Sequence, residues 1–485
     1  MLGEAAIIKR IKDFARRAFS KTNSGAGKVT KTLTKPIVLT RDQHSISRKQ
    51  IDENALKVLY RLHNAGFEAY LVGGCVRDLL LGIQPKDFDV TTNAKPEQVK
   101  NLFRNCRLVG RRFRLAHIVF GREVIEVATF RGHHDSSEEE PAANSGKTQH
   151  SRQNDAGMLV RDNVYGSIEE DAARRDFTVN ALYYNIADFA IYDYANGVRD
   201  LNDGLIRMIG DPVTRYREDP VRMLRAVRFA TKLNMRLDAS VSGPLLEFST
   251  LLQSIPAARM FEESLKLLAA GKAVANFDML SEYNLFQQLF PQLKSYLKAK
   301  SEPPYQMIRQ TLADTDARIQ NGQRITPAYL FAALLWWPLQ ARQESLLSEG
   351  GLAPMDALNL AASDVFGRQV QTISVPKRFS IPAREIWQLQ SRLARSKGKR
   401  AETLLTHPRF RAAYDFLLLR AKTAGADKDQ LTKLAEFWTR LQKEVGPVEV
   451  KRPDRVADEA GPSKRRRGGR GGRNRRRKPP VNKGE

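Results

Sequence analysis

The stretch Tyr70–Thr92, YLVGGCVRDLLLGIQPKDFDVTT, joins a two-glycine turn to two aspartates one residue apart. The apolar run before Gly73 and Gly74 predicts a buried strand that enters a tight turn and then a helix. Glycines have no Cβ, so the backbone of such a turn can approach a phosphate group closely. Arg77 adds a fixed positive charge beside the turn. The first half of the stretch therefore predicts an anion-binding turn.

The second half of the stretch is Asp87-Phe88-Asp89, on an extended run. Side chains at positions i and i+2 of a strand share a face, so both carboxylates should point the same way while Phe88 packs behind them. Two carboxylates held so close favour a cation between them. No His or Cys lies near them in sequence, so the ligands are oxygens, which favours Mg²⁺, with Mn²⁺ as a substitute, over zinc.

The charge of the whole chain indicates a polyanionic partner. The 485 residues carry a formal net charge of +26, with a pI of about 10.1. A positive field of this size favours RNA, DNA or an anionic membrane surface. At about 150 residues per domain, the length predicts roughly three domains.

Cysteine content and hydropathy limit the compartment. Cys75 and Cys106 are the only cysteines, so the chain has neither a disulfide framework nor a cysteine-based metal site, as expected for a reducing, cytoplasmic protein. No segment is long and apolar enough to predict a membrane span. Residues 1–20 have the pattern of a basic amphipathic helix, which predicts weak membrane-surface association or a helix docked on a partner.

The pattern along the chain predicts an α+β fold: a small mixed-sheet head followed by an all-α region. Residues 46–68 predict a helix before the first strand, and two runs around Gly121-Arg122 predict a hairpin. Strand patterns return at 181–186 and 190–194, and from residue 219 to about 445 the pattern is helical. The predicted units are an N-terminal extension and linker (1–45), a catalytic head (46–210) with a loop insert (133–157), a helical neck (211–275), a helical body with an RNA-binding region (276–450) and a disordered basic tail (451–485).

The C-terminal tail is a second candidate for RNA contact. Residues 451–485 hold fourteen Lys and Arg against four Asp and Glu, and no aromatic residue. Such a segment is expected to be disordered and to attract phosphates through charge, without a stacking platform for bases.

Glu126 is a candidate for completing the metal site. It lies in the apolar strand VIEVATF, on the face that Val124 and Ala128 share. A carboxylate from a strand next to the two aspartates would add an oxygen ligand, and two-metal phosphoryl transfer needs several. An exposed Glu on the solvent face of a half-buried strand explains the position equally well.

Two further motifs carry candidate residues. Arg174–Asn180 has the pattern of a helix, on which Asp176 and Asn180 share a face and Arg175 adds positive charge; by spacing alone, Asp176 reads as a helix cap. In the second motif, Asp219 precedes Pro220 at a predicted helix start, which is a good N-cap pattern.

Arg222 gives the second motif a possible chemical role. A carboxylate acceptor beside an arginine donor, here Asp219 with Arg222, matches the edge of adenine or cytosine, whereas guanine and uracil present the reverse order. Arg225 and Arg228 extend the basic face toward phosphates or RNA. The motif therefore predicts a site that accepts A and C.

These motifs together resemble the bacterial (class II) branch of the polymerase-beta-like nucleotidyltransferases, which contains tRNA CCA-adding enzymes and bacterial poly(A) polymerases. The resemblance covers Tyr70 to about Leu237 in order, through LVGGCVRDLLLG with DFD, RRDFTVNALYY, DYANGVRDLNDGLIRMIGDP and REDPVRMLRAVRFATKL. It implies that Asp87 and Asp89 hold catalytic Mg²⁺ and that Asp176 is a third essential carboxylate. It also implies that Asp219 and Arg222 read the base.

The resemblance also bears on the product. Residues 108–118, LVGRRFRLAHI, look like the segment that marks the poly(A) polymerases of this branch, and the basic tail is similar to theirs. The expected activity is template-independent addition of AMP from ATP to RNA 3′ ends, with RNA-decay machinery as an expected partner. CCA addition to tRNA, which would use the same catalytic residues, is one alternative. A non-catalytic RNA-binding protein on the same fold is the other.

Overall fold

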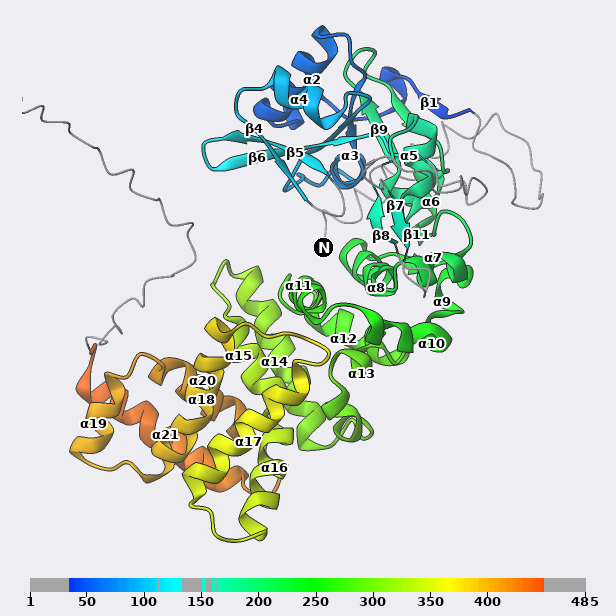
Figure 1. Ribbon diagram of the computed structural model, residues 1–485. Coiled ribbons are helices and arrows are strands. Elements are labelled where there is room, and N and C mark those ends of the chain that lie inside the picture. Colours follow the sequence, from blue (N-terminus) through cyan, green and yellow to red (C-terminus); the bar gives the residue numbers. More distant parts are fainter. Residues whose placement is uncertain (1–34, 111–113, 133–150, 154–158, 163, 449–485) are drawn as a thin grey trace, which may run out of the picture.

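A computed structural model describes residues 35–110, 114–132, 151–153, 159–162 and 164–448 (Figure 1). Three expectations lie outside the described residues: the helix over 1–20, most of the loop insert, and the tail 451–485. Within the described ranges, a mixed sheet forms the head and helices form nearly all of the rest, as the sequence predicts.

An eight-stranded sheet forms the head, in the order β1-β10-β9-β2-β3-β6-β5-β4. The β3–β6 pair is parallel, and every other neighbouring pair in this sheet is antiparallel. The strands are β1 (Ile37–Leu39), β2 (Ala69–Val72), β3 (Asp89–Thr92), β4 (Cys106–Val109), β5 (Leu115–Phe120), β6 (Glu123–Thr129), β9 (Leu182–Asn185) and β10 (Ile191–Asp193).

Both faces of the sheet are covered at its centre, which explains the uninterrupted apolar run in β2. Ala69 and Leu71 belong to the main core, against which α2 and α3 pack, whereas Tyr70 and Val72 belong to a smaller aromatic cluster that includes Ile168 of α5. Alternate side chains of a strand point to opposite faces, so a strand buried on both sides reads as continuously apolar. The head helices are α2 (Glu53–Asn64), α3 (Gly74–Leu80), α4 (Pro96–Leu102), α5 (Ile168–Arg174) and α6 (Gly197–Asp203).

The structure confirms the hairpin predicted around Gly121-Arg122, but part of the predicted loop insert 133–157 forms a strand. β5 and β6 pair antiparallel across Gly121 and Arg122, with Phe120 opposite Glu123. Residues 151–153 were expected in the loop insert, but they form strand β7 (Ser151–Gln153), which pairs with β8 (Leu159–Asp162). Their polar sequence lacks the apolar alternation that predicts a strand. The strand belongs to a two-stranded sheet separate from the main one.

Asp193, at the end of β10, fixes the turn that follows it. Its buried carboxylate accepts hydrogen bonds from the backbone N–H groups of Ala195, Gly197 and Val198, at 2.9–3.0 Å. A Cβ at Gly197 would lie 2.2 Å from the carbonyl oxygen of Thr178, so this turn packs directly on the segment that carries Asp176. Asp193 thus positions a motif about fifteen residues earlier in the chain.

Helices continue from the head through a neck into a body, as the colours in Figure 1 show. One hydrophobic core runs from the head into α18 and α20, and a second joins parts of α18, α19, α20 and α21. The helices are α7 (Pro212–Glu218), α8 (Val221–Leu233), α9 (Ala239–Ser242), α10 (Leu245–Phe248), α11 (Ala257–Leu268), α12 (Ala273–Glu282), α13 (Leu285–Leu289), α14 (Pro303–Gln320), α15 (Pro327–Leu334), α16 (Trp336–Ser348), α17 (Pro354–Gln369), α18 (Lys377–Arg395), α19 (Lys399–Leu405), α20 (Phe410–Thr423) and α21 (Lys428–Val445). A short parallel pair, β11 (Leu205–Ile206) with β12 (Arg236–Leu237), joins head to neck.

Among the helices of the described ranges, none combines the length and the apolar character that crossing a bilayer requires.

Asp193→Ala should destabilise the head. The change leaves three buried N–H groups without their acceptor, and each such group costs about 1–3 kcal/mol. We expect a loss of at least about 2 kcal/mol in the free energy of unfolding, measured by urea denaturation. Asp203→Ala, which removes an exposed carboxylate at the end of α6, is the matched control. Equal stability of the two variants would contradict this role of Asp193.

Candidate active site

The two aspartates share a face, as predicted. Asp87 and Asp89 are exposed, and the Phe88 between them is buried in the main core. Asp89 is the first residue of β3, so its carboxylate stands at the end of a central strand. The alternation that strand geometry requires is therefore present across the whole motif.

Glu126 lies beside Asp89 on the neighbouring strand. The parallel pairing of β3 with β6 places the two residues in register. Although Asp89 is exposed by surface area, the surrounding protein shields its carboxylate from much of the water. This loss of solvation, followed by the charges of Glu126 and Asp87, raises the pKa of Asp89 to about 6, against the opposing charge of Arg175. Glu126 also meets His117 on β5, where Oε1 lies 3.4 Å from Nε2. Three carboxylates thus act on one another at the end of β3.

These carboxylates fit a divalent cation as an incomplete ligand set. Loss of solvation and then the neighbouring like charges raise the pKa of Asp89, and a bound cation would relieve the repulsion between the carboxylates. Within the described ranges, however, no three His, Cys, Asp or Glu side chains converge closely enough to hold a metal by themselves. The donors present are all oxygens, which suits a hard cation that shares ligands with phosphates.

The two-glycine turn precedes α3, as predicted. Gly73 has φ = +75°, a conformation that favours glycine, and its N–H donates to the Leu182 carbonyl of β9. The first backbone hydrogen bond of α3 runs from the Arg77 N–H to the Gly73 carbonyl. The N–H groups of Gly74 and Cys75 therefore precede the helical ladder.

Arg175 joins this turn to the carboxylates. Its Nη1 is 3.4 Å from the position of a Cβ on Gly73, a van der Waals contact distance, so the guanidinium lies directly against the turn. Its Nε and Nη2 donate to Asp171 Oδ2, at 3.2 and 3.0 Å, and Nε also donates to the Tyr183 hydroxyl at 2.9 Å. The positive charge of Arg175 lowers the pKa of Asp89, which other effects raise.

Arg77 was expected beside the phosphates, but the structure buries it. Its side chain is 2% exposed. Nε and Nη2 donate to Asp78 Oδ1, and Nη1 donates to Asn180 Oδ1 at 2.5 Å. The guanidinium also lies over the Phe229 ring of the neck, 5.3 Å from its centroid. Arg77 therefore ties the turn to the neck and orients Asn180.

Asp176 is not on a helix, which corrects the prediction for residues 174–180. Helix α5 ends at Arg174, and a short 3₁₀ turn (Thr178–Asn180) follows an extended segment. The expected Asp176–Asn180 contact nevertheless forms, at 3.3 Å. Asp176 Oδ2 lies 2.6 Å from Arg225 Nη2, and this charge holds its pKa low against the effect of burial. Glu126, rather than Asp176, is the third carboxylate beside Asp89.

Arginines gather where head meets neck. Burial and the charges of Arg131, Arg215 and Arg222 lower the pKa of Arg174 to about 10. Arg215 Nη2 donates to the carbonyl oxygens of Arg174 and Arg175 at 2.5 and 2.6 Å, which holds α7 against the end of α5. So much confined positive charge favours a polyanionic ligand.

The predicted base-reading pair is separated into two ion pairs. Asp219 receives two hydrogen bonds from Arg259 of α11, at 2.9 and 2.7 Å. Arg222 instead donates through Nη1 to Glu218 Oε2 at 2.7 Å and to the Arg215 carbonyl at 2.9 Å. Helix α8 begins one residue later than predicted, and Asp219 Oδ1 still accepts from the Val221 N–H.

Arg225 and Arg228 continue along α8, as expected, and both lie near one aromatic ring. Their guanidinium carbons are 5.7 and 4.7 Å from the centroid of Phe229. The side chain of Arg225 is 37% exposed. The Arg228 pKa is lowered by burial and by the charge of Arg225. The basic face of the neck thus turns toward the Asp176 segment.

Sequence reasoning missed two residues of the site. His117 was predictable from the hairpin. It lies four residues before Gly121 and Glu126 lies four after Arg122, so the two residues face each other across the pair of strands. Arg259 carried no such signal, since it meets Asp219 across forty residues and from another helix.

Comparisons with known proteins identify the relatives of this chain. Three family profiles match the chain: "Poly A polymerase head domain" over residues 69–207, "Probable RNA and SrmB- binding site of polymerase A" over 234–297, and "Polymerase A arginine-rich C-terminus" over 350–479.

Individual relatives divide into near and distant groups. The chain is 51% identical to Poly(A) polymerase I of Salmonella typhimurium over 95% of its own length and 97% of that protein. It is 38% identical to the CCA-adding enzyme of Lactobacillus helveticus over 44% of this chain and 49% of that protein. The crystal structure of the Bacillus stearothermophilus CCA-adding enzyme in complex with CTP aligns with a TM-score of 0.50 and 26% identity, covering 82% of this chain and 83% of that one.

Arg77→Gln should destabilise the protein more than Arg225→Gln does. Removing Arg77 breaks a buried ion pair, which costs about 3–5 kcal/mol, whereas Arg225 is partly exposed to solvent. Thermal unfolding of the two variants, followed by circular dichroism, measures the difference. A stable Arg77→Gln variant that is deficient only in nucleotide binding would contradict the structural role of Arg77.

Proposed function

The chain belongs to the family of the bacterial poly(A) polymerases, and from that premise we propose how its residues add AMP from ATP to RNA 3′ ends without a template. The observation that carries the proposal is the position of Arg175, which lies against Gly73 and acts on Asp89. A triphosphate at the two-glycine turn would then have the carboxylates next to it.

We assign the metal-binding role to Asp87 and Asp89, with Glu126 as a third oxygen donor. Mg²⁺, or Mn²⁺ in its place, would activate the RNA 3′-hydroxyl as a nucleophile and neutralise charge on the triphosphate. The chain's own contribution is to hold the carboxylates in register on β3 and β6, so that no reorganisation is needed when the nucleotide binds.

The triphosphate would be held by backbone and guanidinium groups. The Gly74 N–H has no hydrogen-bond acceptor among the described residues, and Gly73 allows the turn by its positive φ. Arg175 faces the same space, and Asp176 anchors Arg225 and Asn180 near it. We therefore propose that Asp176 positions the nucleotide-binding groups rather than holding the metal.

Base selection would use Asp219 and Arg222, each fixed by a different partner. Arg259 fixes both oxygens of Asp219, and Glu218 fixes Arg222 through Nη1. Within the described residues, Arg222 Nη2 forms no hydrogen bond or ion pair, so it remains a donor for a ring nitrogen while Asp219 accepts from an exocyclic amine. This order of groups matches adenine or cytosine.

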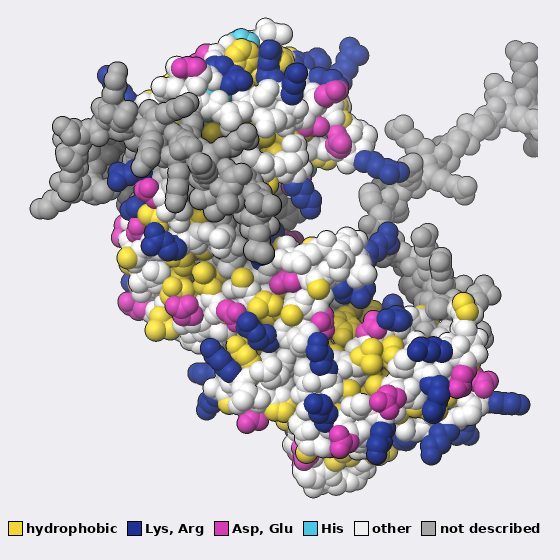
Figure 2. Space-filling view, turned by 180° about the vertical axis from the view of Figure 1, so that it is seen from behind, with side chains coloured by type: hydrophobic (Ala, Val, Ile, Leu, Met, Phe, Trp, Pro, Cys, Tyr) yellow, Lys and Arg dark blue, Asp and Glu magenta, His cyan; other side chains and the backbone are white. Residues whose placement is uncertain are grey.

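RNA would contact the helical region and the tail through charge. Figure 2 shows Lys and Arg side chains spread over the helical part of one face. The tail adds fourteen Lys and Arg to this field. We propose a cytoplasmic enzyme, consistent with its two free, buried cysteines, and RNA-decay machinery as its protein partner.

An incorporation assay separates this function from CCA addition and from RNA binding alone. Purified protein receives Mg²⁺, a generic RNA or a tRNA that lacks CCA, and either ATP or CTP. Long tails made from ATP on the generic RNA support the proposal. A few additions confined to tRNA indicate CCA addition, and no incorporation indicates a binding protein.

Asp87→Ala should abolish AMP incorporation while RNA binding persists, because the carboxylate is exposed and serves the metal rather than the fold. Incorporation is measured with radiolabelled ATP and binding by fluorescence anisotropy. Glu53→Ala, which removes an exposed carboxylate on α2 of the same domain, serves as the control. Full incorporation by Asp87→Ala would refute the assigned metal site.

Arg259→Ala should weaken base discrimination. Without its two hydrogen bonds, Asp219 loses its fixed orientation, and we expect kcat/KM for ATP to fall about tenfold or more while GTP and UTP change less. The control is Arg217→Ala, an exposed neck arginine that does not contact Asp219. An unchanged ratio of ATP to GTP efficiency would show that Arg259 does not set the reading pair.

A further inference from the structure

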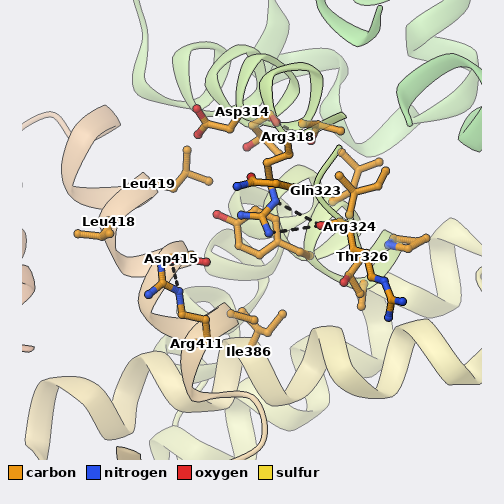
Figure 3. A pocket seen from close by; sticks show the side chains of 18 of the residues that line it. Asp314, Arg318, Gln323, Arg324, Thr326, Ile386, Arg411, Asp415, Leu418 and Leu419 are labelled. Carbon is orange, nitrogen blue, oxygen red and sulfur yellow. Dashed lines mark hydrogen bonds and ion pairs between the residues drawn. The ribbon is translucent and has the colours of Figure 1, made fainter. Parts of the chain in front are cut away.

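A pocket of about 620 Å³ lies in the helical body, among α14, α15, α18, α20 and the connection 321–326 (Figure 3). Ligand sites of proteins commonly measure about 300–1,000 Å³. None of its lining residues belongs to the carboxylates, the glycine turn or the neck arginines described above. The pocket therefore has its own chemistry to explain.

Tyr329 supplies a hydroxyl that lacks a partner. Its ring packs edge-on against Phe416, with centroids 6.1 Å apart. Within the described part of the chain, no hydrogen bond to its hydroxyl is formed. Burial and then the charges of Asp415 and Asp314 raise the Tyr329 pKa, with Arg318 opposing, so the group stays protonated. Tyr329 is half-buried at the pocket, and a ligand there would supply a hydrogen-bond partner for its hydroxyl.

Asp415 supplies a free acceptor on the same side. Arg411 Nε lies 3.0 Å from Oδ1 of Asp415, one turn along α20. The second oxygen, Oδ2, has no hydrogen bond within the described ranges. Figure 3 shows the ion pair at the edge of the pocket, with Ile386 below it and Leu419 above.

Cations without carboxylate partners complete the lining. Arg318 donates only weakly, to the Arg324 carbonyl at 3.4 and 3.3 Å. Among the described residues, neither it nor Arg324 nor Lys422 forms an ion pair. Because Arg411 is engaged by Asp415, these three cations face one remaining lining carboxylate, Asp314, and the pocket keeps a net positive charge. Such charge suits a phosphate group.

The apolar part of the lining suits a flat ring. Pro327, Ile386 and Leu419 contribute apolar surface next to the polar groups. A carboxylate acceptor near a hydroxyl donor matches adenine, which offers an amino donor next to a ring-nitrogen acceptor. Uracil and guanine present a carbonyl where adenine presents its amino group, so they would leave Asp415 unpaired.

We propose that this pocket binds one adenosine nucleotide of single-stranded RNA, upstream of the 3′ end that reacts in the head. Proteins read unstacked RNA bases through such edges and apolar walls, with cations on the adjoining phosphate. The inference rests on the proposed function, because that function makes the RNA near the 3′ end rich in adenosine. The pocket would then hold the enzyme on its own product.

Binding of labelled oligo(A) and oligo(U) of equal length tests the proposal, with the full chain and without ATP or metal. Tyr329→Phe removes only the hydroxyl, so it should lower affinity for oligo(A) about fivefold, a hydrogen bond of about 1 kcal/mol, and leave oligo(U) nearly unchanged. Asp415→Ala should weaken oligo(A) and leave oligo(U) equal or tighter, since it removes a negative charge. Arg368→Gln, an exposed cation of α17 outside the pocket, should preserve the ratio of the two affinities.

The outcomes are distinct. An oligo(A) to oligo(U) ratio unchanged in both pocket variants, with thermal melts equal to wild type, overturns the proposal. Calorimetric titration with AMP alone tests the other source of the same chemistry: AMP binding that is weakened in Tyr329→Phe, together with an unchanged oligo(A) to oligo(U) ratio in that variant, would assign the pocket to a free nucleotide and overturn the RNA assignment. Failure of the wild type to incorporate AMP would contradict the proposed function but not the binding result, because the binding assay involves no reaction.

Discussion

The arrangement of the site depends on the contacts that the guanidinium of Arg175 makes. Asp171 and the Tyr183 hydroxyl hold it from α5 and β9, and the Tyr183 hydroxyl itself donates to Asp171 at 2.8 Å. Gly73 lies against it at the end of β2. Arg175 thus joins α5 and β9, its near neighbours in sequence, to a turn about a hundred residues earlier in the chain. Breaking such a buried pair costs about 3–5 kcal/mol, so the arrangement is fixed before any nucleotide arrives.

A site that is assembled before the nucleotide binds needs carboxylates for the metal and arginines for the triphosphate. The two groups must lie close together without forming ion pairs with each other. The carboxylates of Asp87, Asp89 and Glu126 stand on strands, and the neck arginines stand on helices that pack against the head. Several of those arginines are fixed by backbone carbonyls or by single carboxylates, as Arg215 and Arg222 are by Glu218. Net positive charge therefore remains for a triphosphate, and net negative charge remains for its metal.

The sequence predicted whatever depends on short-range geometry. Strand alternation placed Asp87 and Asp89 on one face, and it placed Glu126 on the exposed face of β6. It did not predict which arginine serves which carboxylate. Arg77 follows the glycines directly but turns inward to Asn180, over a hundred residues away, and Asp219 is held by Arg259 rather than by its neighbour Arg222. Such pairings arise from tertiary packing, which local periodicity does not encode.

The central claim is that the exposed carboxylates beside Arg175 hold divalent metal when a nucleotide is bound. Electron paramagnetic resonance of Mn²⁺, titrated into the full chain with a non-hydrolysable ATP analogue, measures this directly. The account predicts bound Mn²⁺ in the wild type and its loss in Asp89→Asn, with the analogue at saturating concentration in both. Equal Mn²⁺ binding by the two proteins would contradict it.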